Sequence, residues 1–99
     1  MTAASLNDRG GGSFALSGEL GFDNVPELWE TSLAAFRPHE GLHIDLQGVT
    51  ASNSAGLALL LEWTRLAHAE GKAIRFSGLP SQMRAVMAVS DLDGVLPID

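Results

Sequence analysis

The stretch Leu42-His43-Ile44-Asp45-Leu46 decides the fold, together with residues 57–70 (LALLLEWTRLAHAE) and residues 73–76 (AIRF). In the first and third stretches apolar and polar side chains alternate, which is typical of a strand with one buried face. The small and polar residues 50–56 predict a loop after the first strand. Residues 57–70 have the length and propensity of a helix, and Gly71 is placed to end it as a C′ glycine. A strand, a helix and a strand over about thirty residues predict a βαβ unit with parallel strands and a right-handed crossover.

A hairpin is predicted ahead of this unit. Residues 14–20 alternate in the same way, with Phe14, Leu16 and Leu20 on the apolar side. The glycines at positions 10–12 predict a turn before this strand, so the residues that precede them supply the other strand of the hairpin. That first strand is the less clearly specified of the two.

Helical spacing predicts two more helices. One begins at Asn24, which has the form of a capping box with Glu27, and it ends before Pro38. The other begins with Ser81 as its cap and runs to about residue 90. After it, residues 95–98 form a short apolar tail that Pro97 restricts to a sheet edge. The apolar stripes of the two helices comprise Val25, Leu28, Trp29, Leu33 and Phe36, and Met83, Val86, Met87 and Ser90, respectively.

The polar side of the strands indicates how the sheet is covered. A parallel sheet between two helix layers has nearly continuous apolar strands, whereas these strands carry Ser17, Glu19, His43, Asp45 and Arg75 on their second face. We therefore expect an α/β fold with a small mixed sheet, helices mainly on one face, and the order β-β-α-β-α-β-α-(β). The length suits a single domain, residues 1–99, of which residues 1–12 are the least clearly specified part.

The composition argues against several classes of function. Because the 99 residues include no cysteine, the chain has no disulfide, thiolate zinc site or cysteine nucleophile. The formal net charge of −6 disfavours nucleic acid and anionic lipid surfaces as partners. No apolar run approaches the roughly 20 residues of a transmembrane helix, and the amino terminus has no export signal. We therefore expect a cytoplasmic protein without direct membrane insertion.

No arrangement of residues predicts catalysis or metal binding. The three histidines, His39, His43 and His68, lack the paired spacing of a metal site. The glycines at 10–12 are not followed by the Lys-Ser or Lys-Thr of a phosphate loop, and Ser54 lacks the glycine context of a hydrolase nucleophile. We expect no catalytic residue, no cofactor, no metal and no small-molecule substrate.

The run Asn53-Ser54-Ala55-Gly56 is the first of two features that suggest a function. One interpretation is structural: Ser54 Oγ caps the helix, and the small residues let the turn approach the sheet. The other is that a hydroxyl at a helix N-terminus suits a phosphate, because free N–H groups and the helix dipole favour negative charge. Ser54 is therefore a possible phosphorylation site, and the two interpretations are compatible.

The second feature is the wide apolar arc of the helix over residues 57–70. At about 100° per residue, its two neighbouring stripes span roughly 220° of the circumference, about twice what a sheet alone covers. Either the flanking helices cover the second stripe, or Leu59 and Trp63 belong to a docking patch for another protein beside the Ser54 turn. The stripes comprise Leu57, Leu60, Leu61 and Thr64, and Leu59, Trp63 and Leu66, respectively.

Two runs resemble the signature of STAS domains, in which a strand ending in Asp-Leu-x-x-Val precedes an Asp-Ser/Thr-x-Gly-Leu helix start. Here the runs are residues 44–49 (IDLQGV) and residues 53–61 (NSAGLALLL). Within that family the chain is most similar to the MlaB group, the cytoplasmic STAS subunits of Mla phospholipid ABC transporters. The matching stretches are residues 15–20, 28–30, 55–61 and 95–97, and the resemblance covers residues 14–98.

The resemblance implies a non-enzymatic adaptor that binds the transporter's ATPase subunit (MlaF-like) at the cytoplasmic side of the inner membrane. There it would support the phospholipid transport that maintains outer-membrane lipid asymmetry. It also implies an alternative, because the related anti-sigma factor antagonists are partner-switching regulators that are phosphorylated at the position of Ser54. Asn53 stands where the family usually has Asp, which weighs against regulated phosphorylation but not against docking. The expected partner-binding residues are Ser52, Asn53, Ser54, Ala55, Gly56, Leu59 and Trp63.

Overall fold

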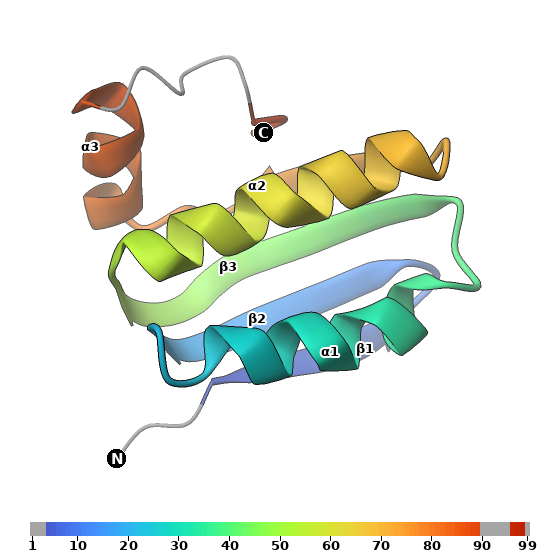
Figure 1. Ribbon diagram of the computed structural model, residues 1–99, viewed down its shortest axis with the longest axis horizontal. Helices are drawn as coiled ribbons and strands as arrows, with labels where there is room; N and C mark the ends of the chain where they lie inside the picture. The colour runs from blue at the N-terminus through green and yellow to red at the C-terminus, as the bar shows by residue number, and fades with distance from the viewer. Residues whose placement is uncertain (1–3, 90–95, 99) are drawn as a thin grey trace.

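The computed structural model describes residues 4–89 and 96–98 (Figure 1). The elements are, in order, β1 (Ser5–Gly10), β2 (Ser13–Leu20), α1 (Val25–Phe36), β3 (Gly41–Ser52), α2 (Ser54–Ala69), β4 (Ala73–Ser77) and α3 (Ser81–Val89). The predicted order of strands and helices is confirmed, and β1 and β2 form the predicted hairpin. Its turn uses positive φ at Gly10, Gly11 and Gly12, a backbone conformation that glycine adopts without strain.

The four strands form one mixed sheet in the order β1-β2-β3-β4. β1 and β2 are antiparallel, whereas β2 pairs with β3 and β3 pairs with β4 in parallel, so the predicted parallel βαβ unit is confirmed. Beyond β4, Ile98 forms a parallel bridge with Phe76, whose N–H donates to the Pro97 carbonyl at 2.9 Å. The described end of the predicted tail therefore lies at the sheet edge, whereas Val95 is outside the described residues.

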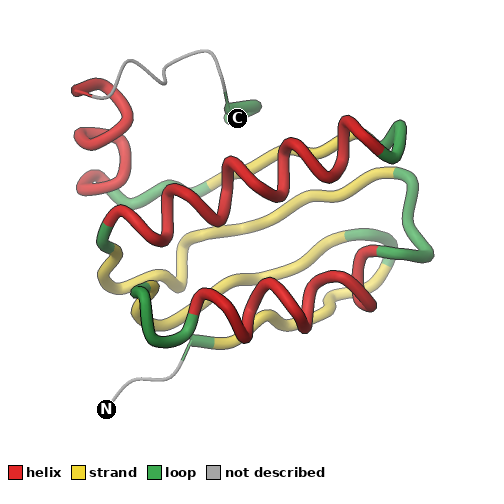
Figure 2. Tube along the Cα trace, in the orientation of Figure 1, coloured by secondary structure: helices red, strands yellow, loops and turns green. Residues whose placement is uncertain are grey.

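Helices α1 and α2 lie side by side over one face of the sheet, and the tube in Figure 2 shows the same arrangement. The strand residues on that face are buried against the helices: Phe14, Leu16, Leu20, Leu42, Ile44, Leu46, Ile74 and Phe76. The other face carries the predicted polar residues, half-buried or exposed: Ser17, Glu19, His43, Asp45 and Arg75. The predicted one-sided helix layer is therefore confirmed.

An aromatic cluster joins the sheet to both helices. The Phe36 ring packs edge-to-face against Phe14 at 5.0 Å and against Trp63 at 5.3 Å between ring centroids. The Trp63 indole N–H donates to Ser32 Oγ at 2.8 Å, and Ser32 Oγ donates to the Trp29 carbonyl at 2.7 Å. Because Trp63 and Ser32 are both fully buried, this hydrogen bond satisfies a polar group that burial would otherwise leave unpaired.

The boundary between β3 and α2 differs from the prediction, which placed a loop at residues 50–56. The strand continues to Ser52, and the helix begins at Ser54. The extra strand residues pair in parallel with β2, where Val49 lies opposite Gly18 and Ser52 lies opposite Leu20, with irregularities in register along the way. Tertiary pairing therefore makes a strand of small and polar residues whose local pattern is typical of a loop.

The capping box predicted at Asn24 is not formed, because Asn24 turns its side chain toward the preceding loop. Its Oδ1 accepts from the Gly21 N–H at 3.0 Å, and its Nδ2 donates to the Glu19 carbonyl at 2.6 Å. No side-chain hydrogen bond caps α1, although the helix starts at Val25 as expected. Asn24 therefore stabilises the loop before the helix, and Glu27 is exposed.

The remaining helix ends are partly as predicted. Gly71 has a φ of 70° and follows α2 as a C′ glycine, and the Lys72 N–H donates back to the Ala67 carbonyl at 2.7 Å. In α3 the first helical hydrogen bond ends on the Pro80 carbonyl, so Pro80 and not Ser81 occupies the cap position. Of the predicted α3 stripe, Met83 and Met87 are buried, Val86 is exposed, and Ser90 lies outside the described residues.

Candidate functional site

The turn between β3 and α2 places Ser54 at the exposed N-terminal end of α2. Asn53 is the N-cap residue, with φ −98° and ψ −169°, and its Oδ1 accepts from the Ala55 N–H at 2.8 Å. The prediction that Ser54 caps the helix is therefore wrong. The cap is the residue whose backbone is still extended, which is one position earlier.

Ser52 and Gly56 hold this turn against the sheet. Ser52 Oγ donates to the Asn53 carbonyl at 2.9 Å, and the Asn53 N–H donates to the Leu20 carbonyl at 3.1 Å. A Cβ at Gly56 would collide with Ser52 Oγ and would lie 3.0 Å from Leu20 Cβ, so only glycine lets the helix approach so closely. Within the predicted partner-binding turn, Asn53 and Ser54 are exposed, Ser52 is half-buried, and Ala55 and Gly56 are buried.

The loop between β2 and α1 lies beside the same turn. A Cβ built on Gly21 would lie 3.5 Å from Asn53 Nδ2. In Figure 1 both connections lie at one end of the molecule, where α1 and α2 begin and run in the same direction. The starts of the two helices therefore form one continuous surface with Ser54 on it.

Leu59 and Trp63 do not form the predicted outward docking patch. They are 2% and 0% exposed, and the Trp63 indole is hydrogen-bonded to Ser32 of α1. The docking interpretation is therefore wrong for Trp63, whereas Leu59 lines the floor of a surface groove between α1 and α2. The alternative, that a flanking helix covers the second apolar stripe of α2, is confirmed for Trp63, which contacts Ser32 and Phe36 of α1.

An apolar groove of about 350 Å³ lies between α1 and α2 and opens to the surface. Trp29, which is half-buried, and Ala58, which is exposed, contribute to its walls, and the buried Leu59 contributes to its floor. Ser54, Ala58 and Glu62 are all exposed and follow one another at a spacing of four, so they form one ridge along α2. Sequence reasoning missed this groove, although the partly apolar first turns of both helices were a signal. The full lining is Val25, Pro26, Trp29, Ala58, Leu59 and Glu62.

The charged side chains around the groove are mostly acidic. Glu62 forms part of the lining, and Glu30 is exposed on the neighbouring turn of α1, whereas Glu27 lines a separate hollow beside β1. Arg65 is the nearest basic residue along α2, and its Nη1 pairs with Glu62 Oε1 at 3.1 Å, with both side chains more than half exposed. An exposed pair of this kind contributes little stability. The groove therefore combines an apolar floor with one carboxylate, that of Glu62, in its lining.

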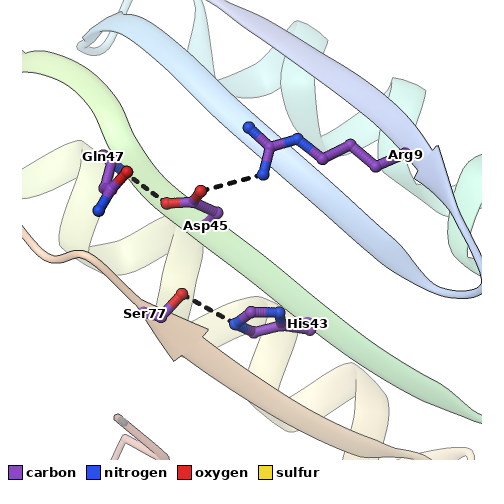
Figure 3. A network of polar contacts seen from close by, with 5 residues as sticks. All are labelled: Arg9, His43, Asp45, Gln47 and Ser77. Atoms are coloured by element: carbon purple, nitrogen blue, oxygen red, sulfur yellow. Dashed lines mark hydrogen bonds and ion pairs between the residues drawn. The ribbon is translucent and has the colours of Figure 1, made fainter.

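The polar face of the sheet holds a separate network that joins three strands (Figure 3). Asp45 Oδ2 accepts from Arg9 Nη1 at 3.0 Å, Asp45 Oδ1 accepts from the Gln47 N–H at 2.9 Å, and His43 Nε2 is 2.8 Å from Ser77 Oγ. The Gln47 N–H, followed by Arg9, holds the pKa of Asp45 below its usual value despite partial burial. Both oxygens of the Asp45 carboxylate already accept hydrogen bonds, from Arg9 and from the Gln47 N–H. The contacts of this network therefore link β3 to β1 and to β4.

The groove lining has few groups that could take part in a reaction. It offers apolar area with few polar groups, which suits burial by a partner better than it suits a reaction. Within residues 4–89 and 96–98, no three His, Cys, Asp or Glu side chains gather as a metal-binding group. Among the helices that the structure describes, none has both the length and the apolar character to cross a membrane.

Solved structures share this fold at low sequence identity. The chain is similar to the anti-sigma factor antagonist SpoIIAA in its unphosphorylated form, with a TM-score of 0.75, 19% identity, and coverage of 98% of this chain and 86% of the other. It is similar to an anti-sigma factor antagonist from Mycobacterium paratuberculosis (TM-score 0.73, 19% identity, coverage 99% and 85%). The Bacillus cell fate determinant SpoIIAA in its phosphorylated form gives a TM-score of 0.72 at 20% identity, with coverage of 98% and 89%.

Sequence comparison assigns the family. No curated protein matches the chain. A family model described as "Mlab, STAS domain" matches residues 7–97, which is nearly the whole sequence and includes both helix starts that border the groove. The chain therefore belongs to the STAS domain family that this model describes.

Proposed function

We propose that this chain is a non-catalytic adaptor that binds the ATPase subunit (MlaF-like) of an ABC-type phospholipid transport system. The observation that carries the proposal is the apolar groove between α1 and α2, whose α2 ridge begins at the exposed Ser54. In this account the groove and the Ser54 turn are covered by the ATPase at the cytoplasmic face of the inner membrane. The bound adaptor supports transport that maintains outer-membrane lipid asymmetry.

Two considerations support a protein partner. The family model bears the description "Mlab, STAS domain", and the chain resembles that group over both helix starts. In addition, the first turns of α1 and α2 are held by the sheet and by capping contacts, for example from Asn53 to the Ala55 N–H. A surface that is already ordered loses little conformational entropy when it binds.

A second candidate function is that of an anti-sigma factor antagonist. The observation that favours it is the exposure of Ser54 as the first residue of α2, where the helix dipole and free N–H groups stabilise a phosphate. The similar solved structures include SpoIIAA in unphosphorylated and phosphorylated forms. In this account a serine kinase modifies Ser54, and the phosphate changes which partner the chain binds.

Binding of the purified ATPase subunit to variants of this chain tests the first proposal. Ala58→Glu places a carboxylate on the groove wall, and Ser54→Glu places one at the start of α2, where it does not destabilise the helix. Burial of an unpaired carboxylate costs several kcal/mol, so each change should weaken binding at least about a hundredfold. Ala34→Glu is the matched control, because Ala34 is an exposed alanine of α1 outside the groove lining. Wild-type affinity in both groove variants, with folding intact, would contradict the proposal.

Two observations separate the candidates. Genes for a lipid-transport permease and MCE-type subunits beside this one favour the adaptor, whereas genes for a serine kinase and a sigma factor favour the regulator. Incubation with that kinase and ATP should phosphorylate the wild type and not Ser54→Ala if the second function is correct. Phosphate on neither protein would contradict the regulator.

A further inference from the structure

We propose that Phe22 is an anchor of the docking surface, and that the partner receives its ring in an apolar pocket rimmed by lysine or arginine side chains. This inference rests on the proposed function and extends its contact area to a residue that lies outside the groove lining. It predicts two features of the partner: a pocket opposite the loop between β2 and α1, and positive charge around that pocket.

The exposure of Phe22 is the first observation. Its side chain is 69% exposed, although Phe is a residue that folded proteins usually bury. The other large apolar residues exposed in the described part of the chain are Val86 and Val89, both on α3. Phe22 is therefore the exposed aromatic residue at the end where both helices border the groove, and aromatic side chains are enriched in the centres of protein interfaces.

The loop that carries Phe22 is held in place on both sides. The Asn24 side chain bonds to the Gly21 N–H and to the Glu19 carbonyl, and the Val25 N–H donates to the Gly21 carbonyl at 3.0 Å. These bonds fix the backbone of a loop whose central side chain packs against little of its own chain. Binding through a pre-ordered loop avoids the entropy cost of ordering it, which is the property expected of an anchor.

Phe22 is continuous with the groove. The hydrogen bond from Val25 back to Gly21 already has helical spacing, so Phe22 precedes the groove residue Pro26 by about one helical turn. A stable interface takes about 20–30 residues from each partner, far more than the residues that line the groove. The contact must therefore extend past the groove, and the loop with Phe22 is the adjoining surface that offers an aromatic side chain.

The charge around Phe22 sets the character of the pocket. No lysine or arginine occurs between Arg9 and Arg37, whereas this stretch contains four carboxylates. Asp23 is exposed beside Phe22 in the loop, and Glu27 and Glu30 are exposed in the first two turns of α1. A partner pocket without positive charge would leave these carboxylates without compensation, so complementary charge is the expected match.

The test is isothermal titration of the purified ATPase subunit with the full-length chain and three variants. Phe22→Ser should weaken binding about 10- to 30-fold, as expected for a buried aromatic anchor, and Phe22→Leu should recover most of the loss. Val89→Ser is the matched control, because Val89 is more exposed than Phe22 and lies on α3; it should bind like the wild type. The thermal midpoints of all three variants should equal that of the wild type, because neither side chain is buried.

The outcomes distinguish this inference from the function on which it rests. If Ala58→Glu abolishes binding and Phe22→Ser binds like the wild type, the anchor is refuted and the adaptor function stands. If the wild type itself does not bind the ATPase, the function is refuted and the anchor with it. Salt screens the attraction between exposed charges, so the affinity of the ATPase for the wild-type chain should fall as the salt concentration is raised. An affinity that does not change with salt would refute the positively charged rim.

Discussion

Replacing Ser32 with alanine removes the acceptor of the Trp63 indole N–H from the centre of the core. The hydrogen bond is 2.8 Å long and joins α1 to α2, and both residues are fully buried. Because Trp63 and Ser32 have no exposed surface, we expect that no water molecule replaces the lost acceptor. The variant therefore tests directly whether Trp63 is a structural residue, as the geometry indicates.

The expected loss of stability follows from two opposing terms. A buried donor left without an acceptor costs about 1–3 kcal/mol. Alanine has a higher helix propensity than serine, which stabilises the variant by about 0.5 kcal/mol at a position inside α1. The net cost is about 0.5–2.5 kcal/mol, which corresponds to a fall in the thermal midpoint of roughly 2–20 °C for a domain of this size.

Urea unfolding followed by circular dichroism measures this cost, and a double-mutant cycle isolates its cause. In a Trp63→Phe background the indole donor is already absent, so Ser32→Ala should cost about 1 kcal/mol less than it does in the wild type. Equal costs in the two backgrounds would refute the reasoning, because the loss would then not arise from the hydrogen bond. Binding of the ATPase should be unchanged in Ser32→Ala at temperatures where it remains folded.

Three further predictions concern the site and the sheet. Gly56→Ala should destabilise the chain by about 1–3 kcal/mol in thermal unfolding despite the gain in helix propensity, since the new methyl would lie 3.0 Å from Leu20 Cβ; a stabilised variant would contradict this packing. Asn53→Ala should cost about 1 kcal/mol in urea unfolding, and Asn53→Asp should not, because aspartate also caps a helix. For Asp45→Asn, the lowered pKa of Asp45 predicts that the wild type is the more stable protein above the ordinary carboxyl pKa, and that its advantage shrinks as the pH falls through the lowered pKa. An advantage that grows on acidification in urea unfolding would contradict that sign.

The parts of the fold that follow from local pattern were predictable from the sequence. The alternation in Leu42-His43-Ile44-Asp45-Leu46 placed the central strand and its polar face, and Gly71 marked the end of α2. What local pattern misses is structure that a distant segment imposes. Residues 50–52 become strand because β2 pairs with them, and Asn24 serves the loop before α1 because Glu19 and Gly21 offer it better hydrogen-bond partners than the helix does.

The candidate site was predictable only in part, for the same reason. The helix start at Ser54 and the excess apolar width of α2 were both visible in the sequence. Periodicity gives the width of an apolar arc but does not say what covers it. The sequence therefore left open whether Trp63 faces a partner or a flanking helix, and α1 buries it. The groove joins Trp29 to Ala58, which are far apart in the chain, and only the side-by-side packing of α1 and α2 brings them together.

The central claim is that this STAS domain acts by docking the starts of α1 and α2 onto a partner. Cross-saturation NMR on the deuterated chain bound to the ATPase tests it most directly, because it reports which amides lie at the interface. The account predicts the strongest transfer at residues 22–29 and 54–62. Transfer centred instead on the polar face of the sheet, around Arg9, His43 and Arg75, would contradict it.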